Sequence, residues 1–108
     1  MSTLTDYIIS RKISVKSVSR HFAAWKLRQF TLDRINRQLL ILSPDKPTPT
    51  VIDLVSPDVS IGRHYYSIDQ YYWLWMKYFD KEEFSLKEMF MKFEYFENME
   101  LWEKVSEF

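Results

Sequence analysis

The chain has 108 residues, a length that suits one domain with a single hydrophobic core. It contains no cysteine, which excludes a disulfide scaffold and any thiolate metal site, and its 46% hydrophobic and 18% aromatic content excludes a disordered chain. The formal net charge is zero, and no apolar run approaches the ~18 residues of a membrane-spanning helix. Because residues 1–6 lack the basic start and apolar block of a signal peptide, we expect one domain over residues 1–108, located in the cytoplasm, free or at the periphery of a membrane.

Most of the chain is predicted to form strands. Seven segments have the alternation, the β-branched content or the aromatic content that strands favour. They are residues 7–9, 24–32, 37–42, 50–55, 59–61, 71–79 and 89–96. The connecting segments carry turn-forming or charged residues. They include residues 10–23, read as the rest of the first strand and a basic loop, the turn 33–36, the proline-rich loop 43–49 and the charged loop 80–88.

The hydrophobic period changes near the C-terminal end. Asn98 is a residue type that caps helix N-termini. After it, Leu101, Trp102, Val105 and Phe108 recur at helical spacing and form one apolar stripe. The sequence therefore predicts a mainly β fold, with seven strands followed by one amphipathic helix.

The predicted strand over residues 24–32 carries both charged and apolar side chains on one face. Side chains alternate across a strand, so Lys26, Arg28, Phe30 and Leu32 point the same way. Phe30 and Leu32 suit a core, whereas Lys26 and Arg28 are too costly to bury without partners. We expect this strand to begin at an open, cationic rim and to run into an apolar interior, a geometry that suits the binding of an anion such as phosphate.

The charges are unevenly distributed along the chain. Residues 1–50 hold nine of the 15 basic side chains and three of the 15 acidic ones, which gives this half a charge of +6 and the other half −6. If the halves stay apart in space, the domain has an electrostatic dipole that would orient it at an anionic surface. If they mix, the dipole disappears.

These patterns together resemble a pleckstrin-homology domain. Residues 25–32 resemble its second strand, of Trp-Lys-x-Arg-x-Phe-x-Leu type, and residues 37–42 lie where its third strand should be. Residues 89–96 resemble the last strand, and residues 97–105 resemble the closing helix, with Trp102 at the position of the hallmark tryptophan. The resemblance implies a bent, seven-stranded antiparallel barrel or sandwich capped by the helix. It also implies a non-catalytic targeting or adaptor module that docks on phosphoinositides or on a protein partner.

The resemblance also indicates a ligand site. In members that bind phosphoinositides, a basic residue at the end of the first strand joins a Lys-x-Arg pair on the second strand, which Lys26 and Arg28 match. Ser10 occupies the aligned first-strand position, and basic residues stand close to it. One arginine side chain can donate two parallel hydrogen bonds to phosphate oxygens, and lysine supplies a mobile point charge. The candidate phosphate-binding residues are Arg11, Lys12, Lys16, Arg20, Lys26 and Arg28.

The aromatic strand 71–79 is apolar on both faces. If the face with Tyr72, Leu74 and Met76 packs in the core, then Trp73 and Trp75 lie outside. Exposed aromatic side chains are typical of protein interfaces, although the N-terminal segment or the loop around residues 84–86 would also serve to cover them. This strand predicts a surface for a protein partner or for a homodimer. The candidate interface residues are Tyr71, Trp73 and Trp75.

The sequence offers no catalytic constellation. His21 and His64 lack carboxylate or cysteine partners at metal-site spacing, and Gly62, the single glycine, cannot form a phosphate-binding loop. We expect no enzyme activity, no cofactor and no metal. An oligonucleotide-binding barrel is a weaker alternative, because the basic and aromatic stretches are separated in the sequence, and we expect no nucleic-acid partner.

Overall fold

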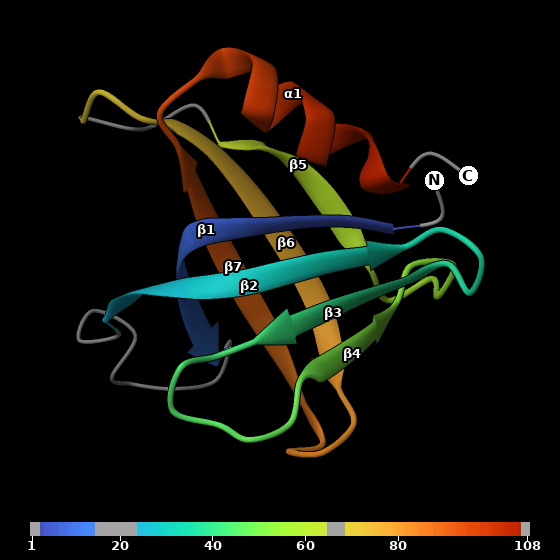
Figure 1. Ribbon diagram of the computed structural model, residues 1–108. Coiled ribbons are helices and arrows are strands. Elements are labelled where there is room, and N and C mark those ends of the chain that lie inside the picture. Colours follow the sequence, from blue (N-terminus) through green and yellow to red (C-terminus); the bar gives the residue numbers. More distant parts are fainter. Residues whose placement is uncertain (1–2, 15–23, 65–68, 107–108) are drawn as a thin grey trace.

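The computed structural model of the chain describes residues 3–14, 24–64 and 69–106 (Figure 1). Its strands are β1 (Thr3–Ser14), β2 (Trp25–Asp33), β3 (Gln38–Leu42), β4 (Thr50–Asp53), β5 (Ser60–His64), β6 (Tyr72–Asp80) and β7 (Ser85–Phe93). The helix α1 (Phe96–Glu103) follows and ends in a 3-10 turn (Lys104–Ser106). The predicted fold class is confirmed: seven strands precede a C-terminal helix.

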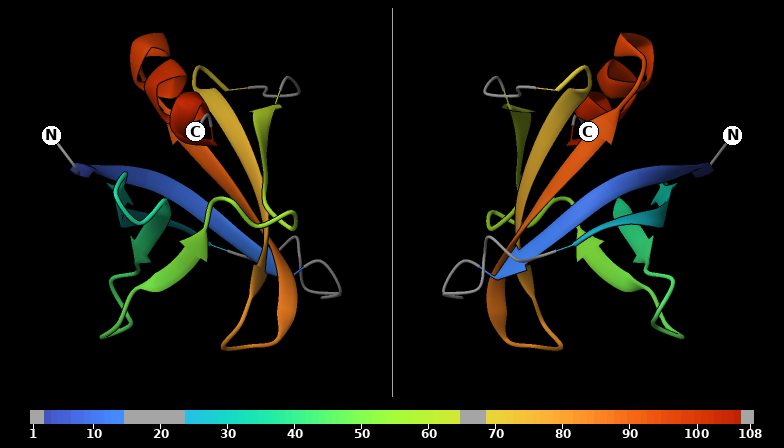
Figure 2. Two further views of the ribbon diagram at one scale, coloured as in Figure 1. Left: turned by 90° about the vertical axis from the view of Figure 1, so that its right-hand side faces the viewer. Right: turned by 90° about the vertical axis from the view of Figure 1, so that its left-hand side faces the viewer.

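The seven strands form one antiparallel sheet in the order β4-β3-β2-β1-β7-β6-β5. The long strand β1 joins the two parts of this sheet, because its residues 3–11 pair with β2 and its residues 9–14 pair with β7. Toward its N-terminal end, β1 diverges from β7, and the sheet curls into a half-barrel (Figure 2).

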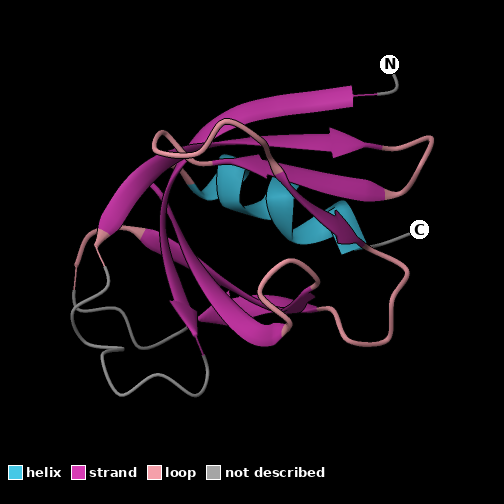
Figure 3. Cartoon of the chain, turned by 90° about the horizontal axis from the view of Figure 1, so that it is seen from below, coloured by secondary structure: helices cyan, strands magenta, loops and turns pink. Residues whose placement is uncertain are grey.

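The core fills the concave side of the curl. Phe30, Leu74 and Met76 are completely buried there, as the alternation within β2 and β6 predicts. Trp102 from α1 is 2% exposed, and its ring packs edge-on against Phe30 with 6.1 Å between centroids. Its Nε1 donates a hydrogen bond to the Asp6 carboxylate on β1 at 3.2 Å. Seen from below, α1 lies between the two groups of strands and closes the far end of the curl (Figure 3).

Six strands begin elsewhere than predicted: β1 begins four residues early, at Thr3 rather than at residue 7, and β2, β3, β5 and β6 each begin one residue late. Strand β7 begins at Ser85 rather than at residue 89, so the predicted charged loop over residues 80–88 is mostly strand. Its charged residues are tolerated because they alternate between faces and find partners: Lys87 contacts Glu83, and Glu88 accepts a hydrogen bond from a tryptophan on β6. Strand β3 begins one residue later than predicted, because Arg37 adopts a left-handed φ of 53° in the turn.

The helix also differs from the prediction. It begins at Phe96, with Tyr95 at the N-cap position, so Asn98 lies inside the helix and does not cap it. The buried stripe consists of Met99, Trp102 and Val105, whereas Leu101 is 44% exposed. The buried stripe is therefore shifted around the helix relative to the prediction, because Met99 packs against the sheet. Phe108, a residue of the predicted stripe, lies outside the described residues. In the part of the chain that is described, no helix is long and apolar enough to cross a membrane.

We predict that Trp102→Ala lowers the free energy of unfolding by about 3–5 kcal/mol, because it empties the closed end of the core. Urea denaturation followed by circular dichroism measures the change. Leu101→Ala is the matched control, since truncating this exposed neighbour should lower the free energy of unfolding by less than about 1 kcal/mol. Equal losses in both variants would contradict the assignment of Trp102 as the closing residue.

Candidate functional site

The end of β1, the start of β2, the β3–β4 loop and the β6–β7 turn lie at the end of the curl opposite α1 (Figure 1). Residues from these segments line a cavity of about 210 Å³. Its lining is mostly basic and hydroxylic. The lining residues are Lys12, Ser14, Lys26, Arg28, Ser43, Asp45, Lys46, Glu83 and Lys87. Five of these nine side chains are basic and two are acidic, and Asp80, which pairs with Lys12 from outside the lining, reduces the local excess to two positive charges. Such a cavity attracts anions.

Arg28 is the most deeply placed of these cations, with 5% of its surface exposed. Its guanidinium donates through Nε to the Ser43 hydroxyl at 2.9 Å. It also donates through one terminal nitrogen to the carbonyl oxygen and the hydroxyl of Ser10, at 2.7 and 3.0 Å. Burial lowers the pKa of Arg28, but an arginine stays charged at any physiological pH. A fixed positive charge held by neutral oxygens therefore lies in the wall of the cavity.

The lysines around the cavity are paired with carboxylates. Lys26 Nζ lies 3.0 Å from an Asp45 oxygen, and Lys46 Nζ lies 3.8 Å from a Glu83 oxygen. Lys87 also contacts Glu83. The pair between Lys46 and Glu83 joins the basic half of the chain to the acidic half, so the two halves mix at this end of the molecule.

The cavity carboxylates are held in their charged forms. A hydrogen bond from Lys26 lowers the pKa of Asp45, and a hydrogen bond from Lys87 lowers the pKa of Glu83. Burial would raise the pKa of Asp80, below the cavity, but hydrogen bonds from the amides of the β6–β7 turn and the charge of Lys12 hold it below its usual value. Burial lowers the pKa of Lys12, and the nearby Lys46 adds to this effect.

The structure brings together part of the predicted phosphate site. Lys12, Lys26 and Arg28 line the cavity. Arg11 lies on the opposite face of β1 from Lys12 and does not line it. The candidates Lys16 and Arg20 lie outside the described residues.

Two lysines of the cavity were missed by the sequence analysis. Lys46 lies in the proline-rich loop, and Lys87 lies in the segment that was read as a loop. For Lys87 a signal existed, because it continues the alternation of Met89 and Met91, which are buried on the same face of β7. No local pattern predicted Lys46 as a cavity residue, since its position depends on how the β3–β4 loop folds back.

The tryptophans of β6 lie on the outer face, as predicted, but they are half-buried rather than fully exposed. The register sets Leu27, Ile9, Lys92, Trp73 and His64 in one row across five strands. Rings on this face cover Trp73, with His64 stacked at 5.4 Å between centroids. Both indoles are also hydrogen-bonded, because Trp73 Nε1 donates to Asp69 at 2.9 Å and Trp75 Nε1 donates to Glu88 at 3.2 Å.

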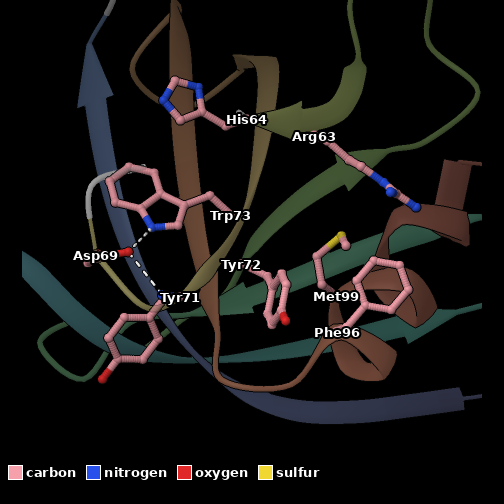
Figure 4. A pocket seen from close by; sticks show the side chains of 8 residues that line it. All are labelled: Arg63, His64, Asp69, Tyr71, Tyr72, Trp73, Phe96 and Met99. Atoms are coloured by element: carbon pink, nitrogen blue, oxygen red, sulfur yellow. Dashed lines mark hydrogen bonds between the residues drawn. The ribbon is translucent and has the colours of Figure 1, made fainter. Parts of the chain in front are cut away.

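A second cavity, of about 260 Å³, lies between the start of β6 and α1 (Figure 4). It is lined by Arg63, His64, Asp69, Tyr71, Tyr72, Trp73, Phe96 and Met99. Its polar groups already hold the fold together: Arg63 makes a paired contact with Glu103 on α1 at 2.6 and 2.9 Å. Asp69 accepts from the Tyr71 amide and from Trp73, as the dashed lines of Figure 4 show. We assign this cavity a structural role.

An exposed apolar patch surrounds a third cavity, of about 260 Å³, beside the N-terminal half of β1. Its side chains are between 38% and 64% exposed. They are Tyr7, Ile9, Leu27, Tyr71 and Tyr95. Large apolar side chains gathered in one exposed place are typical of a contact surface. This apolar patch includes only Tyr71 of the three predicted interface residues.

No protein-family model matches this sequence, and no curated protein is significantly similar to it. The arrangement of the elements is nevertheless specific. A curled, seven-stranded antiparallel half-barrel with a C-terminal helix across one end has a pleckstrin-homology-like topology. Within the described ranges, no group of three or more His, Asp or Glu side chains is placed to hold a metal ion.

We predict that Arg28→Met destabilises the fold by about 1–3 kcal/mol, because the oxygens of Ser10 lose a charged donor while they stay buried. Urea unfolding measures the loss. Lys26→Met is the control, since its exposed pair with Asp45 should contribute less than about 1 kcal/mol. Similar stabilities for the two variants would show that Arg28 does not anchor the cavity wall.

Proposed function

We propose that this chain is a pleckstrin-homology-like, non-catalytic module that docks its protein on anionic membranes containing phosphoinositides. The observation that carries the proposal is the gathering of five basic side chains around one cavity, opposite α1, against only three carboxylates, Asp45, Glu83 and the Lys12 partner Asp80. The pleckstrin-homology-like topology supports it, because the cavity uses the end of the first strand and the Lys-x-Arg pair of the second strand.

The chemistry of the cavity suits phosphate groups. Lys26 and Lys46 are partly exposed at its mouth, so their ammonium groups can meet a ligand from solvent. Arg28 contributes a charge that its serine partners do not neutralise. Each basic side chain near an anionic leaflet adds about 1 kcal/mol of attraction, so several of them at one end of a small domain supply useful membrane affinity.

We predict that Lys26→Gln/Lys46→Gln weakens binding to phosphoinositide vesicles about thirtyfold, because it removes two charges worth about 1 kcal/mol each. Sedimentation with the vesicles measures the affinity, and binding should weaken as salt is raised. These two lysines are chosen because they leave Arg28 and the core untouched.

The matched control is Arg34→Gln/Lys104→Gln, which removes the same charge outside the cavity. Its binding should stay within about threefold of the unmodified protein. If both double variants lose affinity equally, the membrane attraction is diffuse and the cavity is not the site. If the cavity variant binds as well as the unmodified protein, the proposal is wrong.

A second candidate function is association with another copy of this chain through the apolar patch. The specific observation is the exposure of five large apolar side chains around one cavity. The charged residues beside them, Asp6, Lys92 and Glu94, are of both signs, so two copies of the patch need not repel each other. A two-fold dimer would pack the same patch of each copy against the other.

We predict that the unmodified protein forms a concentration-dependent dimer and that Tyr7→Ser/Leu27→Ser makes it a monomer. Analytical ultracentrifugation at several concentrations measures the state. Val51→Ser/Val55→Ser, which changes exposed apolar residues elsewhere, should leave the dimer intact. A protein that is monomeric at every concentration would exclude this function.

A further inference from the structure

The ammonium group of Lys92, on the outer face of β7, lies among three aromatic rings. Its Nζ is 4.2 Å from the centre of the Trp25 ring, 5.2 Å from that of Tyr71 and 5.3 Å from that of Trp73. All three distances are within the ~6 Å over which a ring face attracts a cation. The rings of Trp25 and Trp73 meet edge to face, at 76° with 5.1 Å between centroids, so they form two walls of a corner that holds the cation.

Asp69 completes this arrangement and fixes its walls. One carboxylate oxygen, Oδ1, accepts hydrogen bonds from the Tyr71 amide at 3.1 Å and from Trp73 Nε1 at 2.9 Å (Figure 4). The other oxygen, Oδ2, lies 3.0 Å from Lys92 Nζ. We call the group of Trp25, Asp69, Tyr71 and Trp73 the aromatic cage. Since Oδ1 positions two of the rings without the lysine, the aromatic cage has contacts that hold its shape when the cation is exchanged.

The chemistry of the aromatic cage favours a quaternary ammonium group. Cages of aromatic rings are the sites at which proteins recognise such groups. A lysine ammonium is compact and strongly hydrated, so enclosing it among rings removes water that it binds well. A trimethylammonium group has the same charge but presents methyl groups to the rings, and it gives up less hydration when they surround it.

We propose that the aromatic cage is a binding site for a trimethylammonium cation, and that Lys92 is its internal occupant, displaced when the ligand binds. The side chains of Lys92 and Asp69 are 17% and 28% exposed, so their ion pair is open to solvent. Ion pairs open to solvent contribute little to stability, and a ligand can therefore replace this one. None of the residues involved lines the cavity opposite α1, so the inference goes beyond the proposed function.

The neighbouring third cavity can receive the displaced lysine. Lys92 and Tyr71 both line this cavity of about 260 Å³, together with the carboxylates of Asp6 and Glu94. Because the lysine stem is long and flexible, its ammonium can turn from Asp69 toward these carboxylates. The aromatic cage and the third cavity together hold three carboxylates and one ammonium group, a balance that favours a second cation.

The tethered lysine also determines which ligands can enter. Because Lys92 belongs to the same chain, its effective concentration at the aromatic cage is on the order of millimolar or higher. An unmodified lysine of another protein has the same ammonium group and no such tether, so it cannot compete. A trimethylammonium group, which the rings prefer, can compete. Such groups occur on choline and on trimethylated lysine, which are the two sources that the test separates.

The test is calorimetry with choline and with its neutral isostere neopentyl carbinol, in which carbon replaces the charged nitrogen. The unmodified protein should bind choline, and Lys92→Ala should bind it about tenfold or more tightly, because the tethered competitor is gone. Both proteins should bind the isostere at least about tenfold more weakly than choline. A peptide with trimethyllysine should also bind, whereas the same peptide with unmodified lysine should not. Tighter binding of the trimethyllysine peptide than of choline would identify a protein as the source of the cation, and the reverse would identify a small molecule.

Two tryptophan variants, each made in the Lys92→Ala protein, provide the control. Trp25→Leu removes one wall of the aromatic cage and should weaken choline binding about tenfold or more. Trp75→Leu changes a half-buried indole of the same sheet face outside the cage and should keep the affinity within about threefold. Circular dichroism checks that both variants fold, and equal losses in both would contradict the site.

Three further results would overturn the inference. Equal affinity for choline and its isostere would show that the rings bind apolar volume and do not recognise charge. Choline binding to Lys92→Ala but not to the unmodified protein would show that Lys92 is a permanent part of the structure. Absence of choline binding to both folded proteins would show that the aromatic cage is no ligand site.

Discussion

The double pairing of β1 is the constraint on which the rest of the molecule depends. Residues 9–11 pair with β2 on one side and with β7 on the other, while residues 3–8 pair with β2 alone. The strand therefore belongs to both parts of the sheet over a short length and then separates from β7. This separation bends one continuous sheet into a curl with two unlike ends, one of which must be closed by apolar side chains.

The two ends of the curl are lined by side chains of different kinds, apolar at one end and charged at the other. At one end, Trp102 fills the space against Phe30, and its indole nitrogen is satisfied by Asp6 from the diverging part of β1. At the other end, the guanidinium of Arg28 donates hydrogen bonds to oxygens of Ser10 and Ser43. A single strand, β2, contributes Phe30 to the first end and Arg28 to the second.

The open end illustrates how a small domain keeps charge near its core. A buried charge is tolerated when hydrogen bonds replace the water that it loses, and Ser10, fully buried, accepts two of them from Arg28. Lys26, Lys46 and Lys87 pair with carboxylates that are more exposed than they are. The result is a gradient from a hydrogen-bonded cation inside to partly exposed ion pairs at the mouth of the cavity.

The sequence by itself determined the class of the fold and the faces of its main strands. Alternation along β2 and β6 is local, so it showed that Phe30, Leu74 and Met76 belong to the core and that Lys26 and Arg28 share a face with Phe30. The tertiary structure alone decided which distant residues meet. Lys46 and Glu83 come together, and Trp73 is covered by His64, because strand register and the curl of the sheet bring them there, and neither is encoded in the pattern of neighbouring residues. Helix phase was likewise set by contact with the sheet, which buried Met99 and left Leu101 exposed, since packing of the whole apolar face outweighs the preference of one capping residue.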